Sequence, residues 1–260
     1  MNHENPYMNG HSWTELNILE TLRHRNPLVI CITNDVVRTF TANGLLTIGA
    51  SPVMSECSED LKDLIVHASA LLINIGTLTP DKAAYYKEAI KLAKAHDVPV
   101  VLDPVGCHAG AYRLSVVLDL IKTGAISLLR GNQSEIKAIY DALSPDNKAD
   151  VSTAGKGVDG AQVKDSAVIA YRLARIINCP VVATGEEDYV SDGARVFAVP
   201  HGHAVMTAVT GTGCLLGAVL AAFFSAYYPC KDRVSIGEFL AYVLAYYGLA
   251  GEHSVQVSGI

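Results

Sequence analysis

The chain has 260 residues, half of them hydrophobic and 7% aromatic, and it carries a formal net charge of −6. This length suits one large α/β domain better than two small ones. Because the basic residues are scattered and outnumbered by acidic ones, the composition argues against a nucleic-acid-binding protein or a polybasic membrane anchor.

The cysteines, the first residues and the longest apolar runs further restrict the class of protein and its compartment. The six cysteines include no CxxC pair, which argues against a zinc site or a disulfide framework. This usage favours a reducing compartment, and we expect the cytoplasm. Residues 1–12 are polar and predict a flexible tail before a single domain at 13–260. The apolar runs 215–224 and 239–250 are shorter than the roughly 18 residues that a membrane span needs, so we expect none.

Strand and helix patterns alternate along the chain. We predict strands at 28–32, 53–54 (a strand or a turn), 70–75, 98–102, 125–129 and 180–183, then a hairpin of 188–191 and 194–199. We predict helices at 13–24, 36–48, 61–69, 80–96, 113–122, 134–143, 163–178, 212–227 and 235–250, with a loop at 144–160. This alternation predicts an α/β fold with a mostly parallel central sheet and helices on both faces.

Ligands of such sheets bind at the carboxyl ends of the strands. The residues that follow the predicted strands are Asn34, 76–77, Asp103, 130–132 and 184–185. We therefore expect them to lie along one edge, facing the late glycine turn at 211–213.

That turn, Val-Thr-Gly-Thr-Gly-Cys at 209–214, leads into the apolar run of the helix predicted at 212–227. The start of a helix leaves N–H groups unpaired and carries about half a positive charge, so it favours phosphate. Thr212 is expected to cap the helix, with Cys214 in its first turn. The alternative is an ordinary loop before a buried helix. The chain has no GxxxxGK[ST] loop, and its glycines lack GxGxxG spacing.

Most of the candidate residues at the strand ends allow a functional and a structural interpretation. Asp103 either holds Mg²⁺ or caps the next turn. Glu135 either lies near the metal or completes a capping pattern that begins at Asn132 or Gln133. Arg130 would face phosphate oxygens, and Thr184 either binds a nucleotide phosphate or belongs to a polar turn. Met54, next to small residues at 49–53, either covers a flat ring or belongs to the core.

Taken together, these motifs resemble the hydroxyethylthiazole kinase family of the ribokinase-like superfamily. The resemblance covers roughly residues 28–226. The matching stretches, in order, are TNDV at 33–36, AN at 42–43, GASPVM at 49–54, NIGTL at 74–78, LDPVG at 102–106, RGNQSE at 130–135, KGVD at 156–159, VATGEEDYVSDG at 182–193 and VTGTGC at 209–214.

The resemblance implies ATP-dependent phosphorylation of the hydroxyl of 4-methyl-5-(2-hydroxyethyl)thiazole, a thiamine salvage step, with Mg²⁺ as cofactor. It also implies a homotrimer whose active sites lie at subunit interfaces. The residue roles it implies are catalysis by Cys214, thiazole binding by Met54, Gly211 and Asn34, ATP binding by Arg130 and Thr184, and Mg²⁺ binding in the region of Asp103 and Glu135.

Two departures from the family pattern bear on these roles. His108 stands where the family usually has glycine, a change that concerns the nearby loop. The family's C-terminal Gly-Pro-Gly segment is absent, which concerns the last helix rather than the chemistry.

For Cys214, a position at a helix N-terminus predicts a more thiolate-like sulfur. Three other functions remain as alternatives to the thiazole kinase. They are a kinase for another hydroxylated heterocycle, an ATP-linked repair lyase for hydrated nicotinamide nucleotides, and a non-catalytic nucleotide sensor.

Overall fold

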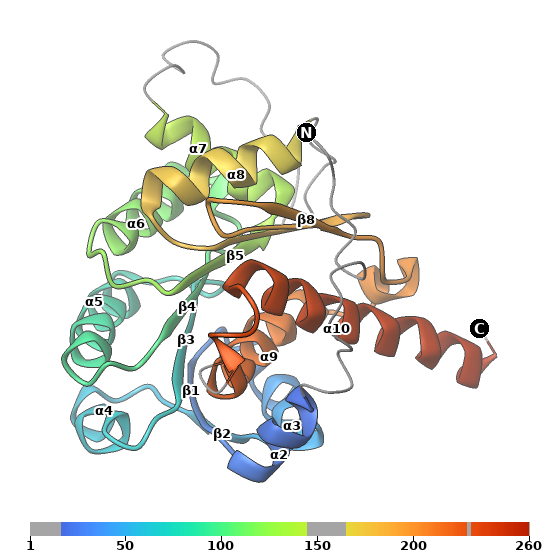
Figure 1. The fold of residues 1–260 in the computed structure, drawn as a ribbon. Helices are drawn as coiled ribbons and strands as arrows, with labels where there is room; N and C mark the ends of the chain where they lie inside the picture. The colour runs from blue at the N-terminus through green and yellow to red at the C-terminus, as the bar shows by residue number, and fades with distance from the viewer. Residues whose placement is uncertain (1–16, 145–164, 228–229, 260) are drawn as a thin grey trace.

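The computed structural model describes residues 17–144, 165–227 and 230–259. The strands of this described part form one eight-stranded sheet in the order β2-β1-β3-β4-β5-β6-β7-β8 (Figure 1). The parallel strands are β1 (Leu28–Ile32), β2 (Ser51–Met54), β3 (Ala70–Asn74), β4 (Val100–Asp103), β5 (Leu128–Asn132) and β6 (Val181–Thr184). The antiparallel strands β7 (Asp188–Ser191) and β8 (Val196–Val199) complete it. The predicted mostly parallel α/β sheet is confirmed.

Helices cover both faces of the sheet, as predicted (Figure 1). One face is covered by α2 (Ile18–Arg25), α3 (Arg38–Ile48), α9 (Thr212–Tyr227) and α10 (Ile236–Ser258). The other face is covered by α4 (Ser58–Ile65), α5 (Pro80–Ala95), α6 (Ala111–Ile121), α7 (Gln133–Leu143) and α8 (Ser166–Ile177). Two short 3₁₀ turns, η1 (Cys107–Ala109) and η2 (Ala204–Ala208), lie between these elements.

The central strands are buried on both faces because each face carries its own apolar core. Along β3, Ala70 and Leu72 pack into the core of α9 and α10, whereas Leu71 and Ile73 pack into the core of α4 to α8. Successive side chains of a strand point to opposite faces. This explains why the sequences of these strands are continuous apolar runs and do not alternate between apolar and polar residues.

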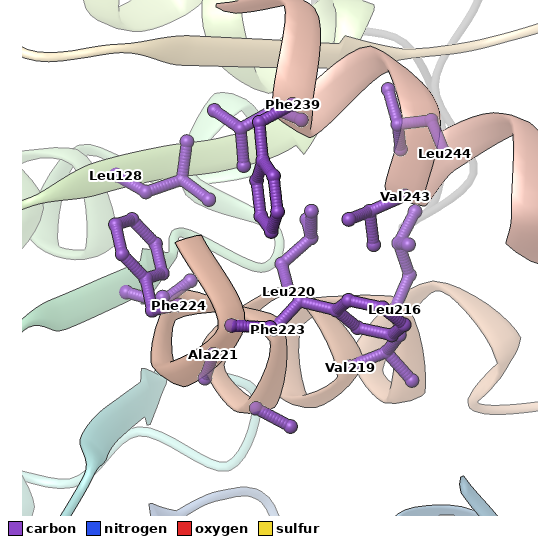
Figure 2. Packing of buried hydrophobic residues seen from close by; sticks show 14 of the residues in the cluster. Leu128, Leu216, Val219, Leu220, Ala221, Phe223, Phe224, Phe239, Val243 and Leu244 are labelled. Atoms are coloured by element: carbon purple, nitrogen blue, oxygen red, sulfur yellow. The ribbon is translucent and has the colours of Figure 1, made fainter. Parts of the chain in front are cut away.

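The helix α9 is the centre of the first core. Its residues from Leu215 to Ala226 are all buried, which explains its unbroken apolar sequence. Figure 2 shows Leu220 and Phe223 of α9 directed toward the same interior as Phe239 and Val243 of α10. Packing on the sheet and on α10 therefore fixes the position of the α9 N-terminus.

Several predicted boundaries were wrong. The strand predicted at 125–129 is β5, three residues later, because Gly124 (φ 62°) extends the preceding turn and Ile126 packs against the core from the loop. The helix predicted at 61–69 is α4, which begins and ends earlier. The last helix runs to Ser258, well beyond 250, because Gly251 does not end it; Gly259 (φ 70°) does.

Other predictions lie outside the described residues. The tail predicted at 1–12 and residues 145–160 of the predicted loop belong to this group. None of the helices that the structure describes has the length and apolarity that crossing a bilayer requires.

Candidate active site

The carboxyl ends of β1, β3, β4, β5 and β6 meet at one edge and are joined there by side-chain hydrogen bonds. The Asn34 amide donates to Asn74 Oδ1 at 2.9 Å, and the Asn74 amide donates to Asp103 Oδ2 at 2.7 Å. Asn74 and Asp103 lie side by side because β3 and β4 are paired in that register. The predicted clustering of strand-end residues is confirmed for these positions.

Arg130 continues this chain of contacts across the sheet. Its guanidinium lies 3.4 Å from Asp103 Oδ2 through Nη1 and donates to Thr184 Oγ1 at 2.8 Å through Nη2. Burial lowers the pKa of Arg130, but the negative groups around it, Asp103 and Glu135 first among them, together outweigh burial and raise that pKa above its ordinary value. The guanidinium therefore stays positively charged in the interior, and its Nε has no partner within the described chain.

The turn that begins α9 faces this row of side chains, as predicted. A Cβ on Gly213 would lie 3.2 Å from Arg130 Nη2, and a Cβ on Gly217 would lie 3.4 Å from Asp103 Oδ2. Asn34 donates to Cys214 Sγ at 3.4 Å. Glycines at these positions therefore let the helix start approach the charged strand ends closely.

The cap of α9 differs from the prediction. Thr212 is the first helical residue, and its hydroxyl donates to the carbonyl oxygens of Met206 and Val209 instead of accepting from the helix. The first intrahelical bond runs from the Leu215 N–H to the Gly211 carbonyl at 2.8 Å. The N–H groups of Gly213 and Cys214 precede that bond and therefore have no intrahelical acceptor.

The Cys214 thiol is not activated in the way that its place in the first turn predicts. Burial and the neighbouring Asp103 carboxylate raise its pKa to about 11, although hydrogen bonds from Asn74 and Asn34 and the charge of Arg130 oppose this shift. The prediction of a thiolate-like sulfur was wrong, because desolvation outweighs the favourable field of the helix N-terminus. Near neutral pH the sulfur is a protonated thiol.

Glu135 has a structural role that the sequence indicated as one alternative. Its Oε2 accepts the Asn132 N–H at 2.7 Å while the Asn132 side chain accepts the Glu135 N–H at 2.9 Å, which is a complete capping box at the start of α7. Its Oε1 also accepts the Gly106 N–H at 2.7 Å. Burial still raises the pKa of Glu135.

The donor set at Asp103 fits a magnesium ion that phosphates help to hold. Asp103 is fully buried, and its Oδ1 has no hydrogen-bond partner within the described chain. Burial raises the pKa of this carboxyl, against the charge of Arg130. Within the described ranges no three His, Cys, Asp or Glu side chains gather in a way that holds a metal ion. Mg²⁺ bound by one or two carboxylates and substrate phosphates needs no such cluster.

The residues expected to contact the substrate lie at the β2 side of this edge. Met54 ends β2, next to β1, and packs partly buried against the α9 core. Gly211 has φ 95°, and a Cβ there would come within 2.7 Å of Val37 Cγ1. Only glycine meets both conditions without strain.

Sequence reasoning assigned no role to two residues of the site. Asn74 is fully buried, and its Oδ1 also accepts the Gly76 N–H at 3.0 Å. The signal was present, since Asn74 is the polar residue of an otherwise apolar strand. Arg113 donates to the carbonyl oxygens of Ile75, Gly76 and Val105, at 2.9, 2.7 and 3.1 Å, and so joins two strand-end loops. Nothing in the spacing of Arg113 indicates these acceptors.

Charged and polar side chains at the strand ends face a glycine turn, and this turn leads into a buried helix. Together with the order of the strands, this arrangement defines an α/β protein of the ribokinase-like class. The fold matches a ribokinase-like superfamily protein from Enterococcus faecalis with a TM-score of 0.61 and 16% identity, over 98% of this chain and 92% of that one. At that identity the likeness concerns the fold alone.

Closer relatives identify the family. Residues 19–259 match the model of the hydroxyethylthiazole kinase family, and the chain belongs to this family. It is 50% identical over 240 residues to a hydroxyethylthiazole kinase of Streptococcus agalactiae, covering 92% of this chain and 89% of the relative. The structure of a hydroxyethylthiazole kinase protein from Pyrococcus horikoshii matches with a TM-score of 0.81 and 33% identity, over 96% and 88% of the two chains.

Proposed function

We propose that this protein transfers the γ-phosphoryl group of ATP to the hydroxyl of 4-methyl-5-(2-hydroxyethyl)thiazole in thiamine salvage. Membership of the hydroxyethylthiazole kinase family supports this activity. The observation that carries it in this chain is the approach of the α9 N-terminus to Arg130, with Arg130 connecting Asp103 to Thr184. Since the reaction uses ATP, we further propose that the protein acts in the cytoplasm.

Arg130 and Thr184 are proposed to bind the phosphates of ATP. Phosphoryl transfer requires mainly positioning and charge stabilisation from a protein. The buried guanidinium supplies charge, and its Nε is free to donate. The N–H groups of Gly213 and Cys214 point from a helix N-terminus, where negative charge is stabilised. Together these donors would hold the transferring group between the turn and the strand ends.

Mg²⁺ is proposed to bind at Asp103 Oδ1, with its remaining ligands from phosphate oxygens and water. When bound there it would neutralise charge on the phosphates. Glu135 is proposed to contribute negative charge and to hold the loop after β4, because both of its oxygens already accept backbone N–H groups. The Asn74 amide would keep Asp103 Oδ2 turned away from the metal.

The thiazole ring is proposed to bind between Met54 and the Gly211 turn, with Asn34 at the inner end of the pocket. Asn34 is supported by its hydrogen bond to Cys214, which brings it next to the proposed reacting hydroxyl. Met54 offers a soft, polarisable surface for a flat ring. The bare backbone of Gly211 lets this turn pack directly against Val37, where a side chain would clash.

Cys214 is proposed to be the catalytic residue that faces the substrate hydroxyl. Its protonated thiol cannot take up the hydroxyl proton, so we propose that this proton passes late in the reaction to an oxygen of the transferred phosphoryl group. A loose transition state requires little deprotonation before that point. We expect Cys214→Asp to keep or raise kcat, because a carboxylate there is a stronger acceptor at neutral pH. Cys214→Ser should retain measurable turnover, and Cys57→Ser, at an exposed thiol, serves as control. A folded Cys214→Asp protein without turnover would contradict a position of residue 214 next to the reacting hydroxyl.

A homotrimer with active sites at its interfaces is also proposed. Three apolar side chains near the Gly211 turn are exposed: Val36 at 70%, Phe40 at 38% and Val209 at 45%. A second copy covering them would close the substrate side of the site. Light scattering should give three times the mass of one chain, and Phe40→Glu should reduce that mass and raise KM for the alcohol together. A monomeric wild-type protein with full activity would exclude this proposal.

The proposed function is tested by measuring ADP release with the thiazole alcohol, with and without Mg²⁺. We expect one ADP per phosphorylated alcohol and no turnover when Mg²⁺ is removed by a chelator. Pyridoxal, adenosine and a hydrated nicotinamide nucleotide are the comparison substrates. Phosphate release without a phosphorylated alcohol would indicate the repair lyase instead, and ATP binding without turnover of any of these compounds would indicate a sensor.

A further inference from the structure

The last helix contacts the segment that leads into the phosphate-facing turn. A Cβ on Gly248 would lie 2.6 Å from the His201 backbone, so α10 and this backbone are in direct contact. Gly251 packs in the same way on Met206, where a Cβ would come within 2.3 Å of Sδ. Glu252 accepts the Gly202 N–H at 2.9 Å. One face of α10 thus holds the chain from 201 to 206 by close packing and a hydrogen bond.

A hydrogen bond completes this contact at the turn itself. The Tyr247 hydroxyl donates to the Thr212 carbonyl oxygen at 2.8 Å. Burial raises the pKa of Tyr247 to about 12, with Arg130 opposing and Cys214 adding to the shift, so the hydroxyl keeps its proton. Tyr247 therefore lies near Arg130 and Cys214, but its hydrogen bond is to the backbone of the turn.

The Thr212 carbonyl belongs to the same peptide unit as the Gly213 N–H. A donor on a carbonyl oxygen polarises the peptide and makes its N–H a stronger donor. The Gly213 N–H has no intrahelical acceptor, because the first such bond starts at Leu215. Gly213 also lies against the Arg130 guanidinium. Tyr247 therefore acts on the N–H that is best placed to meet a phosphoryl group beside Arg130.

We propose that Tyr247 is a positioning residue for phosphoryl transfer: its hydroxyl fixes and polarises the Thr212–Gly213 peptide so that the Gly213 N–H donates to the transferring group. This inference rests on the proposed kinase function. It adds a residue of the last helix, α10, to the proposed active site, whereas the other residues of this helix contribute to the reaction only through packing.

The test compares Tyr247→Phe with Tyr246→Phe. Tyr246 is the matched control: it lies on the same helix, packs its ring 5.8 Å from Phe223, and its hydroxyl bonds no other described residue. Tyr247→Phe should lower kcat about five- to tenfold, less than the hundredfold or more for removing a transition-state donor. KM for ATP and for the alcohol should stay within about twofold, because the interaction strengthens only in the transition state.

An NMR measurement tests the inference independently of activity. The Gly213 amide proton should move upfield in Tyr247→Phe and stay in place in Tyr246→Phe, because only the former loses the donor on Thr212. Tyr247→3-fluorotyrosine keeps the hydroxyl and makes it a more acidic, stronger donor, so the Gly213 amide proton should move downfield while kcat is kept. This variant keeps the inference testable if the phenylalanine variant does not fold, because an unmoved Gly213 resonance would then overturn it.

The outcomes separate the two proposals. Unchanged kcat in Tyr247→Phe, an equal loss in Tyr246→Phe, or an unmoved Gly213 resonance would overturn the role of Tyr247. A rise in KM for ATP with unchanged kcat would also overturn it, since that pattern marks ground-state binding. A wild-type protein that phosphorylates no alcohol would instead refute the proposed function, and the Gly213 resonance would still report on the hydrogen bond.

Discussion

Replacing Arg130 by methionine is expected to lower kcat/KM for ATP by about a thousandfold, because it removes the buried positive charge at the transferring phosphate. Methionine retains the apolar stem but not the guanidinium atoms that lie beside Gly213, so it leaves a small gap there. The remaining Asp103 carboxyl can take up a proton, because burial already raises its pKa. The loss should therefore appear mainly in the steady-state kinetics, with a folded protein by circular dichroism.

The control for this prediction is Arg130→Lys, which retains the charge but not the planar guanidinium. Arg130 contacts Asp103 and Thr184 through two separate nitrogens, and a single ammonium reproduces only part of that geometry. We expect lysine to recover about one-tenth of the wild-type activity at most. A folded methionine variant within threefold of wild type would exclude Arg130 from phosphate binding.

Asp103→Asn is expected to lower kcat by about a thousandfold and to weaken the response to Mg²⁺. The new amide would turn its oxygen toward the Asn74 donor. Its NH₂ group would then occupy the position of Oδ1, where a metal ion requires an oxygen ligand. The measurement is kcat as a function of free Mg²⁺ at saturating ATP.

Asp119→Asn is the matched control for Asp103→Asn, because it makes the same chemical change at an exposed carboxylate paired with Lys87. It should leave the Mg²⁺ dependence unchanged. If Asp103→Asn needs no more Mg²⁺ than wild type and keeps its rate, then the metal is bound elsewhere.

The fold was predictable because its signals are local and repeated. Apolar runs such as β3, buried on both faces, indicate a parallel sheet, and that inference gave the shared edge of Asn34, Asp103, Arg130 and Thr184. Boundaries were less predictable, since they depend on packing. Gly251 reads as a helix end in sequence, but it is the point where α10 contacts Met206.

The parts of the site that could not be predicted depend on burial and on long-range contacts. The helix field at Cys214 suggested a lowered pKa, and only the structure shows that desolvation is larger. Tyr242, Tyr246 and Tyr247 look alike in the sequence of an apolar helix. Only the packing of α10 brings the third hydroxyl to the Thr212 carbonyl.

The most direct test of the central claim is a crystal structure with a non-hydrolysable ATP analogue and the thiazole alcohol. We expect the terminal phosphate to lie between the Gly213 amide and the Arg130 guanidinium, with the alcohol oxygen facing Cys214. A triphosphate bound away from this turn, while Arg130 still joins Asp103 to Thr184, would contradict it.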